Sequence, residues 1–398
     1  MRKIIPSYKD MFKKNYLYLF MIYFVFFFMN GPLEQSLVLL FQNMGFNEVF
    51  YGIFLSLNNA VGIFLPSAVA ILTIKFKFKR VTIIGLLISI TGGILLGIIS
   101  GPWPAVICAL ILFSGRAFFN FSFGSIVNIS IPANERAKYF VVRDLFLFGG
   151  ISAGLLAGSR IISRINIGWL YISFSIGLAF ALFLVLFYAG RIDNAGDTKD
   201  AEKTKRKLRL SHIKKDKVML TFVLVQCLKQ IYGTTTAFVP LLAMQLGLDA
   251  GNVLSIIGIV TFCNSILSVF LAHLSDATGR KKLFILDIII DIIPCLLYAF
   301  TSSVLFFCIG LAVSTIKDAF APISFAYLYD CLDDDKTVTM IGLIDSASNA
   351  VGLFIPALMG LLWSISYRSV FIIGAAACLL AAILSAINLP AKNIEMTK

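Results

Sequence analysis

Long apolar runs alternate with short polar segments along almost the whole chain. Twelve runs stand out, at residues 16–42, 49–74, 81–100, 104–131, 139–162, 168–190, 218–244, 252–274, 283–301, 303–330, 338–362 and 369–389. A helix needs about 20 apolar residues to cross the hydrocarbon core, whereas barrel strands would be about half as long and would alternate in polarity. Because backbone groups in lipid must be hydrogen-bonded within the segment, the pattern predicts twelve transmembrane helices.

The composition excludes a water-soluble fold. Hydrophobic residues make up 59% of the 398 residues and charged residues 14%, compared with about 45–50% and about 25% in soluble domains. The net charge of +13 raises the alternative of a nucleic-acid-binding protein. The basic residues lie between the apolar runs and not on one globular face, so we expect the lipid bilayer, and no nucleic acid, as the surroundings of this chain.

Cysteine usage gives no indication of a bound group. The seven cysteines stand singly, without a CxxC pair or a Cys/His cluster. The sequence therefore predicts neither a disulfide framework nor a metal site, and we expect no cofactor.

The distribution of lysine and arginine predicts the orientation in the membrane. With the N-terminus inside, 27 of the 34 basic residues fall in cytoplasmic segments and three in outer loops. By the positive-inside rule, both termini are expected in the cytoplasm. The first apolar run is long and lacks a cleavage site of small residues, so it is interpreted as a retained span. The short loops favour a plasma membrane, as in a prokaryotic inner membrane.

An internal repeat appears when the chain is shifted by 202 residues. Gly31 and Gly45 then align with Gly233 and Gly247 at the outer ends of spans 1 and 7. At the same shift, the series Gly150, Gly154 and Gly158 aligns with Gly352, Pro356 and Gly360. At a shift of 201 residues, Arg116 aligns with Lys317, and Asp144 aligns with Asp345. Together these matches indicate two halves of the same topology, an arrangement that places a substrate site near the middle of the membrane.

The repeat predicts three parts. Residues 1–190 and 218–398 are each expected to form a six-helix bundle. Residues 191–217, with ten basic and five acidic residues, are expected to form a cytoplasmic linker held near the anionic inner leaflet.

The loop after span 8 resembles a motif of the major facilitator superfamily. The segment Leu271–Lys282 reads LAHLSDATGRKK, where the family has G-x3-D-x2-G-[RK]-[RK]. Ala272 replaces the first glycine, and the copy after span 2 keeps only its basic end. The matching residues, which the resemblance identifies as a gating loop, are Asp276, Gly279, Arg280, Lys281 and Lys282. The resemblance implies an all-α integral membrane protein of twelve helices in two pseudo-symmetric six-helix bundles, and a monomeric transporter instead of an enzyme.

In this superfamily, spans 1, 4, 7 and 10 line the central cavity, and here each of them carries an ionisable residue. A charge facing lipid costs at least about 2.5–3.5 kcal/mol, so such residues should face a cavity or a partner. The predicted substrate-cavity residues are Asn30, Glu34, Asn58, Arg116, Asn120, Gln226, Lys229, Gln230, Lys317 and Asp318.

Depth along the helices predicts two ion pairs. At 1.5 Å per residue, Glu34 and Arg116 lie about 12 Å and about 18 Å from the outer ends of their spans, a difference that long side chains can bridge. The same arithmetic allows a pair of Lys317 with Asp345. The simpler interpretation is that both pairs only neutralise buried charge. The functional interpretation is proton coupling by Glu34, Arg116 and Asp345, because burial and a neighbouring cation act in opposite directions on the pKa of a carboxyl group.

The sequence leaves the roles of two acids of span 9 open. Asp287 lies within reach of the basic cluster Arg280–Lys282, whereas Asp291 lies deeper and no partner is assigned to it.

The span 4 segment LFSGRAFFN, with Arg116, is similar to that of the twelve-span drug/proton antiporters, although the glycine expected after the arginine is absent. The glycine-rich segment FGGISAGLLAGSR of span 5 resembles a motif linked to exporters, but its Gly-Pro pair is missing. The resulting prediction is a proton-coupled exporter of small organic or drug-like molecules.

Two alternatives stay open beside this prediction. An uptake symporter for a small polar metabolite or an organic anion would use the positive charge of Arg116, Lys229 and Lys317. A membrane receptor or enzyme has less support, since the spans contain no nucleophile–base pair, HExxH or phosphate loop.

Overall fold

The computed structural model describes residues 14–130, 136–188, 217–278, 280–318 and 334–390, together with residues 320, 327 and 331. This part of the chain is helical and contains no strand. The helices are α2 (Lys14–Gln35), α3 (Leu37–Asn43), α4 (Glu48–Ile98), α5 (Pro102–Ser130), α6 (Arg136–Arg164), α7 (Ile167–Phe187), α9 (Lys217–Thr236), α10 (Val239–Gln245), α11 (Ala250–Thr278), α12 (Arg280–Ile290), α13 (Ile292–Phe300), α14 (Val304–Asp318), α16 (Asp334–Ile365) and α17 (Tyr367–Asn388).

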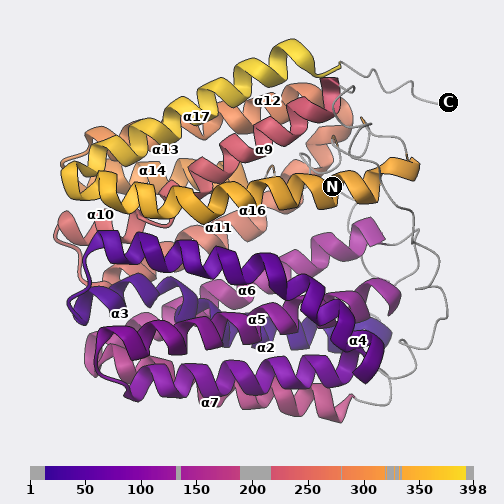
Figure 1. Ribbon diagram of the computed structural model, residues 1–398, viewed down its shortest axis with the longest axis vertical. Coiled ribbons are helices and arrows are strands. Elements are labelled where there is room, and N and C mark those ends of the chain that lie inside the picture. Colours follow the sequence, from indigo (N-terminus) through magenta and orange to yellow (C-terminus); the bar gives the residue numbers. More distant parts are fainter. Residues whose placement is uncertain are drawn as a thin grey trace. The chain divides into compact units, whose positions relative to one another are not determined.

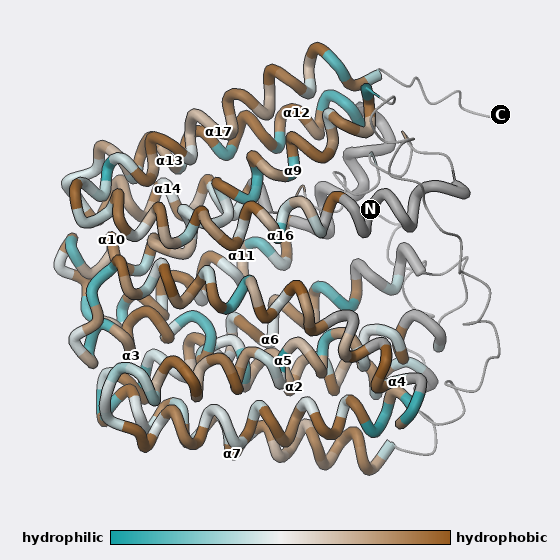
Figure 2. The backbone as a smooth tube through the Cα atoms, viewed as in Figure 1, coloured by the Kyte–Doolittle hydropathy of each residue, from teal (hydrophilic) through white to brown (hydrophobic). Residues whose placement is uncertain are grey.

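Within the described residues, ten helical segments are long and apolar enough to cross a membrane. The shorter apolar segment Val304–Ile316 corresponds to the tenth predicted span, and α9 to the seventh. Figure 2 shows hydrophobic residues along most of the length of these helices, for example in α7 and α17. The chain is therefore an all-helical, multi-pass integral membrane protein.

Several predicted spans differ from the observed helices in their continuity. The first span breaks at Ser36 into α2 and α3, and the ninth breaks at Asp291 into α12 and α13. Spans 2 and 3 correspond to two helical segments of α4, which are separated at Lys77, where the backbone is not helical (φ 62°, ψ 150°). The break in span 1 leaves the Leu33 carbonyl without its normal helical donor, and the hydroxyl of Tyr171 on α7 donates to it at 2.8 Å.

The chain forms two compact units. Unit 1 comprises residues 1–46, 61–204 and 249–265, and unit 2 comprises residues 47–60, 205–248 and 266–398. Each unit thus contains a short helical segment from the other half of the sequence. The predicted linker 191–217 lies outside the described residues, apart from Lys217.

In unit 1, α2 lies beside α6 and α7 (Figure 1). The phenylalanines of α2 form much of this core, and Phe26 stacks on Phe119 of α5 with their ring centroids 3.7 Å apart. Gly154 of α6 faces the Phe28 carbonyl so closely that a methyl group there would collide with it.

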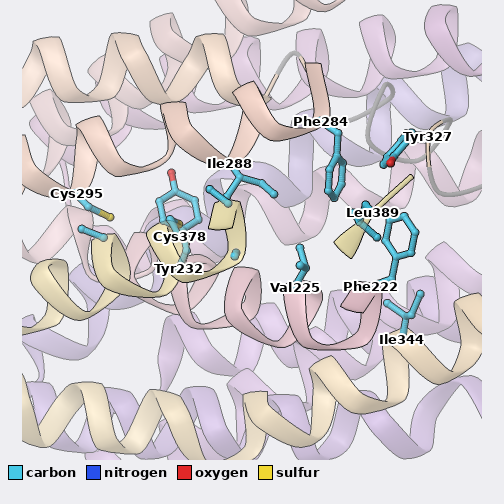
Figure 3. Packing of buried hydrophobic residues seen from close by; sticks show 13 residues of the cluster. Phe222, Val225, Tyr232, Phe284, Ile288, Cys295, Tyr327, Ile344, Cys378 and Leu389 are labelled. Carbon is cyan, nitrogen blue, oxygen red and sulfur yellow. The ribbon is translucent and has the colours of Figure 1, made fainter. Parts of the chain in front are cut away.

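In unit 2, α9 packs against α16 and α17, and α13 packs against α14 and α17 (Figure 1). A buried cluster, drawn in Figure 3, joins α9, α12 and α17. Its aromatic part consists of Phe222, Phe284 and Tyr327, and Cys295 and Cys378 lie toward its other end. All seven cysteines are free thiols.

The internal repeat appears in the helix boundaries as well as in the sequence. The segments α2, α3 and the start of α4 correspond to α9, α10 and the start of α11 at a shift of 201 to 203 residues. Gly45 and Gly247, which are equivalent in the repeat, have φ of 80° and 88° and end α3 and α10 in the same way. Their amides donate to Gln42 and Met244, which are equivalent in the repeat as well.

Candidate functional site: two buried ion pairs

The first charged centre joins α2 and α5 in unit 1. The guanidinium of Arg116 forms an ion pair with the carboxylate of Glu34, as the helix depths predicted. Glu34 lies in the last turn of α2, directly before the break at Ser36. Its side chain is 32% exposed and that of Arg116 is 21% exposed. The pair is therefore partly shielded but still accessible from outside the protein.

The second charged centre joins α9 and α12 in unit 2. The ammonium of Lys229 donates to a carboxylate oxygen of Asp287 at 2.7 Å. Asp287 is 1% exposed and Lys229 is 16% exposed, and the ammonium also lies 5.9 Å from the centroid of the Phe284 ring. This ion pair is much more deeply buried than the first.

Asp287 forms an ion pair with Lys229 of α9, a partner that the sequence did not indicate, whereas the sequence placed it within reach of the basic cluster Arg280–Lys282. The physical reason is that Asp287 lies two turns into α12, where burial is nearly complete and the cation on the adjacent helix α9 is within hydrogen-bonding distance. Asp291 follows one turn later, at the break between α12 and α13, and its side chain is completely buried.

The neutral residues predicted for the cavity differ in their burial. Asn30 is buried in α2, whereas the side chains of Asn58, Asn120, Gln226 and Gln230 are partly exposed. Gln230 of α9 approaches Gly352 of α16, since a Cβ added at Gly352 would lie 3.1 Å from the amide nitrogen of Gln230.

Other predicted site residues lie outside the described residues. These are Gly279 and the side chains of Asp276, Lys317, Asp318 and Asp345, so the predicted pair Lys317–Asp345 is among them.

Lys281 of the predicted gating loop belongs to α12, and its side chain contacts the C-terminal end of a second helix, α17. Its ammonium donates to the Leu389 carbonyl at 2.5 Å and to the Ala386 carbonyl at 3.2 Å, both at the C-terminal end of α17. A cation at this position satisfies carbonyls that have no helical donor and opposes the negative end of the helix dipole. Lys281 therefore joins α12 to α17 within unit 2.

Two polar contacts of the spans were not predicted. Arg143 donates to the carboxylate of Asp144, its neighbour in α6, at 2.5 and 2.8 Å. The adjacency of opposite charges inside an apolar run is the signal that identifies this pair. Asn59 donates to the Gly352 carbonyl at 2.7 Å, a contact between distant segments that no sequence pattern indicates.

A chain of long apolar helices with a repeated arrangement and charged side chains paired inside its spans belongs to the class of multi-pass membrane transporters. The family model described as "Major Facilitator Superfamily" matches residues 19–316 and 255–397, which together include almost the whole chain. The chain belongs to the major facilitator superfamily, and is thus a transporter and not an enzyme.

Solved structures show the same fold at low sequence identity. A point mutant of the nucleoside transporter NupG is 13% identical with a TM-score of 0.77, and the alignment covers 94% of this chain and 99% of that one. The xylose transporter XylE from E. coli is 12% identical with a TM-score of 0.71, covering 95% and 96%. A POT family transporter in complex with a thioalcohol-conjugated peptide is 12% identical with a TM-score of 0.74, covering 93% and 94%. No curated protein matches the sequence.

Proposed function

We propose that this protein is a proton-coupled secondary transporter that exports small organic molecules of neutral or cationic, drug-like character. The proposal rests mainly on the Glu34–Arg116 pair, which lies on two helices that line the cavity in this superfamily and which is accessible from outside the protein. A carboxylate held by one arginine can release that partner and bind a proton when a substrate or a moving helix changes its surroundings. Proton binding and substrate release are thereby linked.

Charge balance supports a substrate that is not an anion. Each of the two predicted cavity cations with a described side chain, Arg116 and Lys229, already forms an ion pair with a carboxylate. An anionic substrate would have to compete with a covalently attached carboxylate at either position. This competition disfavours the alternative of organic-anion uptake.

The direction of transport is proposed from the resemblance of the span 4 segment around Arg116 to that of the drug/proton antiporters. The glycine series of span 5 adds little support for export, because Gly154 of that series is accounted for by the close contact between α6 and α2.

We further propose a monomer in the plasma membrane, with both termini in the cytoplasm.

A direct test is substrate-dependent proton movement in proteoliposomes that carry a pH-sensitive dye inside. Lipophilic cations, nucleosides, sugars, peptides and organic anions are added in turn, with the pH gradient in either direction. We expect a lipophilic cation or a neutral amphipathic compound to move protons in the direction opposite to its own movement.

The Glu34→Gln variant separates coupling from binding. We expect it to abolish substrate-dependent proton movement while substrate exchange without a gradient continues, because glutamine keeps the size of the side chain and cannot bind a proton. The matched control is Glu48→Gln at the start of α4, which should couple normally. Proton movement that persists in Glu34→Gln would exclude Glu34 as the proton carrier. A substrate flux of the parent protein that does not change with the pH gradient would exclude proton coupling.

A further inference from the structure

Pro356 interrupts the hydrogen bonds of α16. Proline has no backbone N–H, so the carbonyl four residues earlier, that of Gly352, lacks its usual helical donor. A proline inside a helix also commonly kinks it, which weakens the hydrogen bonds of neighbouring backbone groups such as the Ala357 amide. Two backbone groups in an apolar helix thus need partners from elsewhere, and each group left unsatisfied in lipid would cost several kcal/mol.

The first part of α4 supplies a partner for each of these groups. The side-chain amide of Asn59 donates to the Gly352 carbonyl at 2.7 Å. The hydroxyl of Ser56 accepts from the Ala357 amide at 3.1 Å. Because Ser56 and Asn59 are three residues apart in a helix, they lie on the same face of α4. One face of α4 therefore supplies a donor to the Gly352 carbonyl and an acceptor to the Ala357 amide.

The two helices approach closely at this contact. A methyl group at Gly52 would collide with the Pro356 carbonyl, and one at Gly360 would collide with the Glu48 carbonyl. The absence of side chains at these positions lets Ser56 and Asn59 reach the backbone of α16.

The contact lies directly before a boundary between the compact units. Residues 47–60 belong to unit 2 together with α16, whereas α4 continues into unit 1 from Val61 onward. Because α4 runs from one unit into the other, any rearrangement of the units must change the conformation or the contacts of this segment. Gln230, a predicted cavity residue on α9, approaches Gly352 as well, and a Cβ there would lie 3.0 Å from the Asn59 amide nitrogen and 3.1 Å from that of Gln230.

We propose that Ser56 and Asn59 are positioning residues that form a reversible latch on the two backbone groups affected by Pro356. The latch holds the first part of α4 to α16, and it opens when the transporter changes state. This inference rests on the proposed function as a proton-coupled secondary transporter. Gln230 is the point at which a substrate would influence the latch. A molecule that contacts Gln230 lies beside the Gly352 carbonyl, which is the acceptor for Asn59. The first half of the sequence has Gly154 at the position equivalent to Pro356, so the helix equivalent to α16 has no proline there.

The test is hydrogen–deuterium exchange of the full-length protein, measured in peptides that contain Ala357 and in peptides from residues 48–60. Asn59→Leu removes the donor at similar size, and Ser56→Ala removes the acceptor. The loss of one hydrogen bond should speed exchange in these peptides about fivefold, with little change elsewhere. Ser364→Ala is the matched control, because the Ser364 hydroxyl is exposed and bonds only within α16, to Leu361.

Pro356→Ala provides the decisive background. Alanine restores an N–H that donates to the Gly352 carbonyl, so Asn59→Leu and Ser56→Ala should then have little effect on exchange. Faster exchange throughout the chain, no local change, or an equal effect in both backgrounds would overturn the latch.

Transport supplies the second readout. In the proteoliposome assay, Asn59→Leu should change the maximal flux, and Pro356→Ala should return it toward that of the parent. Altered exchange with unchanged flux would overturn the role of the latch in transport. Exchange requires neither substrate nor a proton gradient, so a failure of the latch can be distinguished from a failure of proton coupling.

Discussion

Three basic side chains inside the described spans, Arg116, Arg143 and Lys229, each form an ion pair with a carboxylate. Two of the pairs, Glu34–Arg116 and Arg143–Asp144, have side chains that are between 21% and 32% exposed. In the third pair, Asp287 is almost completely enclosed beside Lys229. The third pair is thus better suited to holding α9 and α12 together than to binding a substrate.

The first prediction concerns the stability of the Lys229–Asp287 pair. Replacing one partner leaves the other charge buried, which typically costs about 3–5 kcal/mol. We expect Lys229→Met or Asp287→Leu alone to lower the midpoint of thermal unfolding in detergent strongly, and the double variant to recover much of the loss. Lys282→Met, at an exposed position of α12, serves as the control and should unfold like the parent. A double variant less stable than both single variants would contradict this assignment.

At the scale of the element, helix packing explains features that the sequence leaves ambiguous. The glycine-rich segment of span 5 resembles an exporter motif, yet Gly154 lies against the backbone of α2 and accounts for part of the pattern by packing. Lys281 belongs to the motif of a gating loop, and it interacts with the end of α17. In both cases the local sequence indicates an unusual contact, and only the neighbouring helix shows which one.

The second prediction tests the contact between α6 and α2. Gly154→Ala adds a methyl group that collides with the Phe28 carbonyl, and such overpacking costs about 1–3 kcal/mol. The variant should unfold at a lower temperature than the parent. Gly149→Ala on the same helix is the matched control, because nothing lies within 4 Å of the added atom. It should be neutral or slightly stabilising, and equal losses in both variants would argue against the packing interpretation.

At the scale of the whole molecule, the two halves of the sequence share the geometry of one turn but differ at the position of Pro356, where the latch is proposed. The turns at Gly45 and Gly247 have the same conformation and the same hydrogen bonds. In contrast, the position occupied by Gly154 in the first half is Pro356 in the second, and Asn59 and Ser56 of α4 bond to the backbone groups near this proline.

The third prediction follows from the repeated turn. An alanine at φ near 80° is strained by about 1–2 kcal/mol, so Gly45→Ala and Gly247→Ala should each lower the unfolding midpoint, and by similar amounts. Gly62→Ala, inside α4 with open space around it, should not. A loss in only one of the two turn variants would show that these turns are not equivalent.

The amino-acid pattern predicts the all-helical membrane fold and the internal repeat, because apolar length and glycine spacing are properties of each segment alone. It also predicted the Glu34–Arg116 pair, since depth along two antiparallel helices can be counted in residues. The tertiary structure decided the partner of Asp287 and the use of Asn59. These depend on how each helix is rotated about its own axis and on which neighbour it meets, and neither property is encoded in hydrophobic periodicity. The Gly352 carbonyl shows this most clearly, because Pro356 predicts that it needs a donor, whereas only the packing of α4 on α16 identifies that donor as Asn59.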